Sequence, residues 1–201
     1  MISERRVQVL SRGPFVTSEF VLVDAVHLAV LQTSGELVPP RLLLSREDDV
    51  HGEVWPLSEA LRVDALLKRE GVTALFAAVS ATAGRVSVCT AGDIRVHLVR
   101  DGRLQCATRD HVYATDPPKV EDMSAVPPAV LASAVTRYVG GTEEANPENL
   151  MWHVSGDYTV IVCSAEIHRH RPPASYVELL LGSERLPDVD GFLCRIDVFS
   201  R

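Results

Sequence analysis

Alternating apolar and polar residues recur along the chain, a pattern that predicts half-buried strands. It is found in residues 7–10 and 84–111. Residues 20–31 are rich in β-branched residues and are interrupted by Asp24-Ala25, which predicts a hairpin of two strands. In residues 84–111, small residues around Gly92-Asp93 and an Asp-Gly pair at 101–102 predict two turns, so we expect an antiparallel meander.

A nearly continuous apolar run at residues 71–79 predicts a strand that is covered on both faces. Helices are predicted at residues 56–69, where Pro56 suits the first turn and Gly71 the C-terminal cap, and at residues 129–139 and 173–181, each followed by glycine. We expect one helix between the hairpin and the apolar run at residues 71–79.

Two consecutive segments resemble a known family. Residues 91–102, AGDIRVHLVRDG, are similar to the G-D-S-R-x-Y-L-x-R-x-G segment of the metal-dependent protein phosphatases of the 2C type, the PPM superfamily. Residues 104–111 are similar to that family's L-x-x-L-T-x-D-H and keep Thr108, Asp110 and His111. The resemblance implies a structural role for Gly92, Asp93, Arg95, Asp110 and His111.

The resemblance also implies the fold. Residues 158–166 are similar to the family's x-L-L-L-C-S-D-G strand, and residues 188–196 resemble its terminal strand. The resemblance covers most of the chain in the correct order, so residues 1–201 are expected to form a single phosphatase 2C-like domain. The expected fold class is α+β, in a reduced α/β/β/α sandwich of two antiparallel sheets flanked by helices.

In the family, aspartates hold two metal ions, and several matching positions differ here. The vestigial metal-site positions are Glu19, Phe20, Gln32, Thr33, Ala165 and Asp190, of which Glu19 and Asp190 keep an acidic residue. A glutamine carbonyl carries no charge, so Gln32 could not bridge two divalent cations as a carboxylate does. Ala165 has no ligand atom. Glu166 follows it, and on a strand its side chain would point to the opposite face.

These differences favour a chain without catalytic residues or a metal cofactor. The expected function is that of a pseudophosphatase, a regulatory module that binds a protein partner such as a kinase or a phosphoprotein. One alternative is a weakly active Ser/Thr phosphatase that uses Glu19, Asp190 and one manganese or magnesium ion. Another is an unrelated ligand in the vestigial groove, although no other catalytic or phosphate-binding motif supports it.

Charge and cysteine content narrow the partners and the compartment. A net charge of −7 and a pI near 5.5 argue against nucleic acid or an anionic membrane as partner. The four cysteines have no C-x-x-C spacing, so we expect buried, reduced thiols and a cytoplasmic location. No signal peptide or membrane helix is expected. Oligomeric state is left open.

Two clusters of charged residues are candidate binding sites. Acidic residues 47–49 lie close to His51, and residues 168–171 read His-Arg-His-Arg. The first could be imagined as a metal site and the second as a metal or phosphate site. A solvated loop is the favoured interpretation of both. A run of charged residues is usually solvated, and no third ligand accompanies the two histidines.

Overall fold

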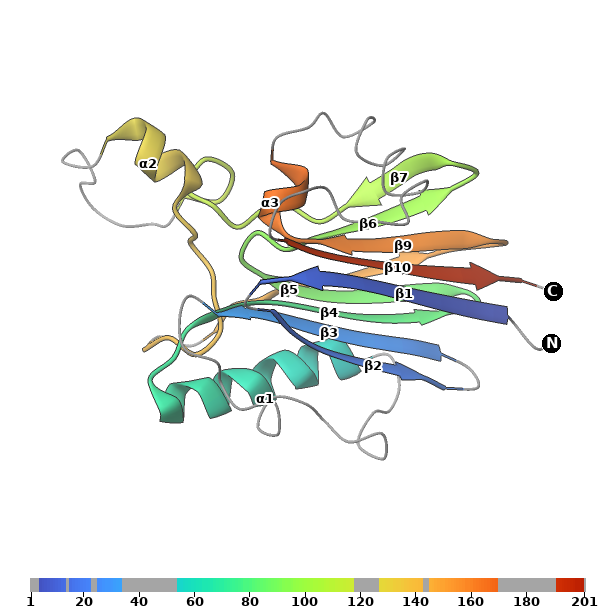
Figure 1. Ribbon diagram of the computed structural model, residues 1–201, viewed down its shortest axis with the longest axis horizontal. Coiled ribbons are helices and arrows are strands. Elements are labelled where there is room, and N and C mark those ends of the chain that lie inside the picture. Colours follow the sequence, from blue (N-terminus) through green and yellow to red (C-terminus); the bar gives the residue numbers. More distant parts are fainter. Residues whose placement is uncertain are drawn as a thin grey trace.

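The computed structural model describes residues 4–13, 15–22, 25–33, 54–117, 127–142, 145–169 and 191–200, and these form two five-stranded antiparallel sheets (Figure 1). The first sheet has the order β1 (Glu4–Arg12), β10 (Gly191–Phe199), β9 (Tyr158–Cys163), β6 (Arg95–Arg100), β7 (Arg103–Ala107). The second sheet has the order β2 (Phe15–Val21), β3 (Ala25–Thr33), β4 (Ala74–Thr82), β5 (Arg85–Ala91), β8 (Glu148–His153). The two-sheet architecture predicted from the sequence is confirmed.

The main core lies between the two sheets. Buried side chains of the second sheet, such as Leu28 and Val79, belong to the same cluster as Val160 and Ile196 of the first. Most of these residues are aliphatic and β-branched, which suits a pleated surface that is buried against another sheet. Eight of the nine residues of β3 are buried, with Gln32 half-buried, and seven of the nine residues of β4 are buried. The burial of β4 on both faces follows its nearly continuous apolar run.

Helix α1 (Trp55–Glu70) covers the outer face of the second sheet (Figure 1). Its buried face includes Trp55, Val63 and Leu67, which pack with Phe76 and other residues of that sheet. Pro56 occupies the first turn, where its missing N–H costs no hydrogen bond. Gly71 ends the helix in the left-handed conformation at φ 66°, so the helix predicted at residues 56–69 is confirmed.

The helix predicted at residues 129–139 is largely wrong. Helix α2 (Pro128–Ser133) is short, and the chain then runs extended. Val135 forms a bridge with Val112, and Val139 forms one with Ala74. The N–H of Val139 donates to the carbonyl of Ala74 at 3.0 Å, so hydrogen bonds to distant segments replace those that would continue the helix.

The predicted three-stranded meander is also wrong, because β5 and β6 belong to different sheets. The chain passes from one sheet to the other at Gly92-Asp93, where Gly92 has φ +101°. The β6–β7 hairpin is confirmed, with positive φ at both Asp101 and Gly102. Alternation of residues shows which face of a strand is buried, but it does not show which strand lies beside it.

The last short helix, α3 (Ala165–His168), begins directly after β9 and packs Ile167 against the outer face of the first sheet. The predicted helix at residues 173–181 lies outside the described residues. Within the described part of the chain, no helix has both the length and the apolar composition needed to cross a membrane.

Candidate functional site

The side chains of Gln32 and Glu166 meet at one end of the two sheets. Gln32 lies at the end of β3, and Glu166 lies in the first turn of α3. Gln32 Nε2 donates a hydrogen bond to Glu166 Oε1 at 3.0 Å, although the two residues are 134 positions apart in the sequence. This contact brings Gln32 next to the residue that follows Ala165.

The structure corrects the expected orientation of Glu166. The predicted strand at residues 158–166 ends at Cys163, and Ala165 already lies in a helical turn. The alternation of side chains along a strand therefore does not apply to Glu166, and its carboxylate faces Gln32.

The environment of Glu166 favours its ionised form. Partial burial alone would raise the pKa of the Glu166 carboxyl. Hydrogen bonds from Ser164, from the backbone and from Gln32, together with the positive charge of Arg169, outweigh this effect, so the pKa lies below its ordinary value. Glu166 is therefore an anion at neutral pH.

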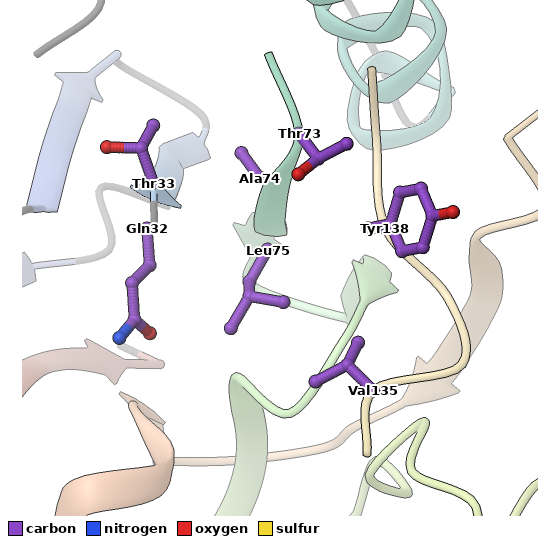
Figure 2. Close-up of a pocket in the computed structure, with 7 residues that line it drawn as sticks. All are labelled: Gln32, Thr33, Thr73, Ala74, Leu75, Val135 and Tyr138. Carbon is purple, nitrogen blue, oxygen red and sulfur yellow. The ribbon is translucent and has the colours of Figure 1, made fainter. Parts of the chain in front are cut away.

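Gln32 Oε1, in the residue that holds this carboxylate, is buried and has no hydrogen-bond partner among the described residues. Together with Glu166 it offers one anionic group and one neutral oxygen, the donor type that a hard divalent cation takes. Thr33 Oγ1 is likewise buried without such a partner, but Thr33 follows Gln32 in β3 and its side chain points to the opposite face (Figure 2). The described residues contain no group of three His, Cys, Asp or Glu side chains that could hold a metal. This donor set fits part of the shell of one cation and lacks the charge to bridge two.

An ionic cluster that includes the buried Asp93 and His168 lies around the end of α3. Arg169 Nη2 pairs with Asp93 Oδ2, and His168 Nε2 lies 2.9 Å from the backbone carbonyl of Asp93. Since a carbonyl only accepts, His168 carries its proton on Nε2. Burial, more than any other effect, lowers the pKa of His168, which keeps it neutral. The solvated loop predicted at residues 168–171 is wrong for His168, which is 2% exposed. His170 and Arg171 lie outside the described residues.

Burial raises the pKa of Asp93, although Arg169 opposes the shift. Asp93 is 3% exposed, and its Oδ1 has no hydrogen-bond partner among the described residues. One carboxylate oxygen is thus held by Arg169 and the other is desolvated. The predicted scaffold role of Asp93 stays a prediction.

The other motif residues are joined by hydrogen bonds. Arg95 donates to both carboxylate oxygens of Asp110, at 2.9 and 2.5 Å. The N–H of Gly92 donates to His111 Nδ1 at 3.3 Å, so His111 carries its proton on Nε2 when neutral. These contacts tie the segment after β7 to the crossing between the sheets. That the motif is structural rather than catalytic stays a prediction.

Several predicted positions are not described in detail. Glu19 and Phe20 lie in β2, paired with Leu28 and His27 of β3, and their side chains are not described. Asp190, acidic residues 47–49 and His51 lie outside the described residues. Gly191, directly after Asp190, begins β10 beside the site, since the N–H of Phe192 donates to Ser164 Oγ at 3.1 Å.

Sequence reasoning missed the contact between Arg169 and Asp93. The two residues are 76 positions apart and lie in different motifs. The only available signal was the cationic residue three positions after Glu166, which has the same appearance as a solvated charge.

Comparison with known proteins identifies the fold. No family model matches the chain, and no similar curated protein was found. Solved structures do match. The S. agalactiae serine/threonine phosphatase has 13% identity and a TM-score of 0.68, over 99% of this chain and 100% of that one. The catalytic domain of the phosphatase PstP, in complex with 2 manganese ions, has 18% identity and a TM-score of 0.64, over 99% of each chain.

The chain has the fold of the PPM-type Ser/Thr phosphatases. A further match is PppA, a key regulatory component of T6SS in Pseudomonas aeruginosa, with 17% identity and a TM-score of 0.68 over 98% of this chain and 99% of that one. The predicted fold class and the resemblance to this fold are confirmed.

The same comparisons correct two expectations. The chain was expected not to be an enzyme, and this is contradicted by PPM-fold neighbours that are Ser/Thr phosphatases. It was expected to need no cofactor, and this is contradicted by the manganese ions of PstP. Both expectations rested on the losses at Phe20, Gln32 and Ala165, and they set Glu166 aside because a strand would point its side chain to the opposite face.

Proposed function

We propose that the chain is a weakly active, metal-dependent Ser/Thr protein phosphatase with an atypical metal site where β3 meets α3. The observation that carries the proposal is the hydrogen bond between Gln32 Nε2 and Glu166 Oε1. It places an ionised carboxylate at the edge of the two sheets in a fold whose solved examples include phosphatases.

The residues of this chain would divide the work as follows. Glu166 and the carbonyl oxygen of Gln32 would hold one manganese or magnesium ion, and Gln32 Nε2 fixes the direction of the carboxylate. A bound divalent cation supplies Lewis acidity toward a phosphoryl oxygen. Arg169 keeps a positive charge near Glu166, and its side chain is 36% exposed, so it favours approach of a phosphate dianion.

Weak activity follows from the neutral residues. Ala165 adds no ligand atom, and Gln32 adds no charge, so a second cation would lack the anionic oxygens that offset repulsion between the ions. The protein partner expected from the sequence would then be the phosphoprotein substrate. We also propose a cytoplasmic location, since all four cysteines are free.

The test is phosphate release from a phosphoserine peptide, with manganese, with magnesium and with EDTA. The wild type should turn over with metal and lose that activity in EDTA. Glu166→Gln should lose about tenfold or more, since it removes the charge and keeps the shape. The matched control is Asp101→Asn, the same chemical change at a position whose side chain is 86% exposed.

Glu166→Gln activity equal to that of the wild type, or turnover that EDTA does not reduce, would overturn the proposal. Because both variants are purified in the same way, a contaminating phosphatase would give equal rates in all three proteins.

A further inference from the structure

A cavity of about 290 Å³ lies beside Gln32 (Figure 2). Its walls come from the end of β3, from residues 73–75 at the start of β4, and from the extended segment that follows α2. Figure 2 shows the residues from β4 between Gln32 on one side and Val135 and Tyr138 on the other. The volume is at the lower end of ordinary ligand pockets and fits a group of side-chain size.

The walls of the cavity are fixed by backbone hydrogen bonds. Ala74 N donates to Val139 O at 2.9 Å, and Thr136 N donates to His111 O at 2.8 Å. Gly92 packs closely against the Leu75 side chain, because a Cβ at Gly92 would lie only 2.6 Å from Leu75 Cδ2. The cavity is therefore preformed, and a ligand would not have to order these segments.

The lining is mainly apolar and reaches the surface. Leu75 and Val135 present aliphatic carbons, and the Tyr138 side chain lies at the rim with 42% exposure. The polar residues of the lining are Gln32, Thr33 and Thr73, and Gln32 is also the residue that holds Glu166. An apolar space of this kind directly beside a charged site suits a substrate that carries both an anion and an apolar side chain.

We infer that this cavity takes an apolar side chain of the peptide substrate, close in sequence to the phosphorylated residue. The inference rests on the proposed function and adds a substrate class, phosphopeptides with a leucine-sized residue near the phosphoserine or phosphothreonine. Peptide is the occupant that the observations favour, because the cavity and the Glu166 site share one residue and so lie within one side chain of each other.

The test uses short phosphoserine peptides that carry a single leucine at successive positions in a glycine background. At one position the leucine should raise kcat/KM by about tenfold or more over the all-glycine peptide, the effect of burying such a side chain. Val135→Phe fills the cavity and should abolish this preference. Val130→Phe is the matched control, since Val130 is exposed in α2 and should leave the preference intact.

Tyr138→Ala is a second variant that widens the rim, in case Val135→Phe does not fold. It should reduce the leucine preference at the same peptide position. Equal kcat/KM at every position in the wild type, or an unchanged preference in both cavity variants, would overturn the inference.

A binding measurement separates this inference from the proposed function. If no peptide is hydrolysed, the proposed function fails, and the same peptides are then compared by fluorescence anisotropy. A leucine preference in Kd that Val135→Phe removes still supports the cavity as a side-chain site. Equal Kd values for all peptides overturn it.

Discussion

The guanidinium of Arg169, at the end of α3, is paired with the carboxylate of Asp93, in the crossing between the two sheets. Asp93 is almost fully buried, whereas the Arg169 side chain is 36% exposed. The pair therefore links the end of α3 to the residues that lead into β6, and its Arg169 side is partly exposed to solvent.

Removal of Arg169 should destabilise the fold. Arg169→Gln leaves the Asp93 carboxylate buried without its counter-charge, so we expect a loss of about 1 kcal/mol, a value reduced by solvent screening of the exposed partner. Urea unfolding of Arg169→Gln, Asp93→Asn and the double variant gives the coupling. Arg100→Gln is the control, because its pairing with Asp101 is exposed and 3.7 Å long, and it should change stability by less than about 0.5 kcal/mol. Additive single effects would show that the pair contributes nothing.

Carboxylates introduced at Gln32 and Ala165 should create a stronger cation site. In EDTA the Gln32→Asp/Ala165→Asp variant should be less stable than the wild type, because added carboxylates near Glu166 repel one another. Manganese should recover this loss and raise Tm by about 5 °C or more, as expected for an ion that binds only the folded chain. Metal-dependent phosphate release should also rise by about tenfold.

The comparison that decides this prediction includes both single variants. If positions 32 and 165 share one site, manganese should raise the Tm of the double variant by more than the sum of the increases in the two single variants. A purely additive gain would mean that positions 32 and 165 do not contribute to one site.

Stability should fall in mild acid because of His97. Burial above all, and then Arg95 and His168, lower the pKa of His97 to about 3, against 6.5 for the ordinary side chain. The unfolded chain therefore binds the proton first as pH falls. The stabilisation is complete above about pH 6.5 and is lost as pH falls toward 3, by about 1.4 kcal/mol per pH unit.

The change of unfolding free energy with pH is measured by urea unfolding between pH 5 and pH 6.5. Most carboxylates titrate below this range, so they contribute little to the change. The His97→Gln variant cannot bind this proton. Its unfolding free energy should therefore depend less steeply on pH than that of the wild type, by the slope that corresponds to about one bound proton. Parallel pH profiles for the two proteins would assign the acid sensitivity to other groups.

Gly140 should not tolerate any side chain. It has φ +87°, and a Cβ there would lie 2.1 Å from the carbonyl oxygen of Val72, while its N–H donates to Asp64 Oδ1 at 2.8 Å. Gly140→Ala should cost about 3 kcal/mol or more in unfolding free energy. Gly84→Ala is the control, since nothing lies within 4 Å of its Cβ, and it should stay within about 1 kcal/mol of the wild type. Equal losses would show that the close approach at Gly140 relaxes at no cost.

Local signals predicted most of the elements. Pro56 and Gly71 mark the ends of α1, and Asp101-Gly102 marks the β6–β7 turn, because each depends on backbone conformations that few residues adopt. Pairing of strands is not encoded in this way. The split of β5 and β6 between two sheets depends on which distant strands, β8 and β9, compete for their edges.

The candidate site was predictable only in part. Gln32 was assigned to the site because it aligns with a metal-ligand position of the resembled family, and its side chain donates a hydrogen bond to Glu166. The orientation of Glu166 was predicted incorrectly, because a strand was assumed to continue for three more residues. The contacts that decide it span more than a hundred residues, and no local pattern of hydrophobic positions reports them.

The pairing of β1 with β10 has a consequence for how the chain is made. Glu4 lies opposite Phe199, so β1 finds its partner only when the far end of the chain has left the ribosome. Until then β1 is an unpaired edge that could join another chain, whereas β3, β4 and β5 are neighbours in sequence and can assemble with α1 during synthesis. Closure of the first sheet across such a long loop is slow, so its formation should be the last and most concentration-sensitive step of folding.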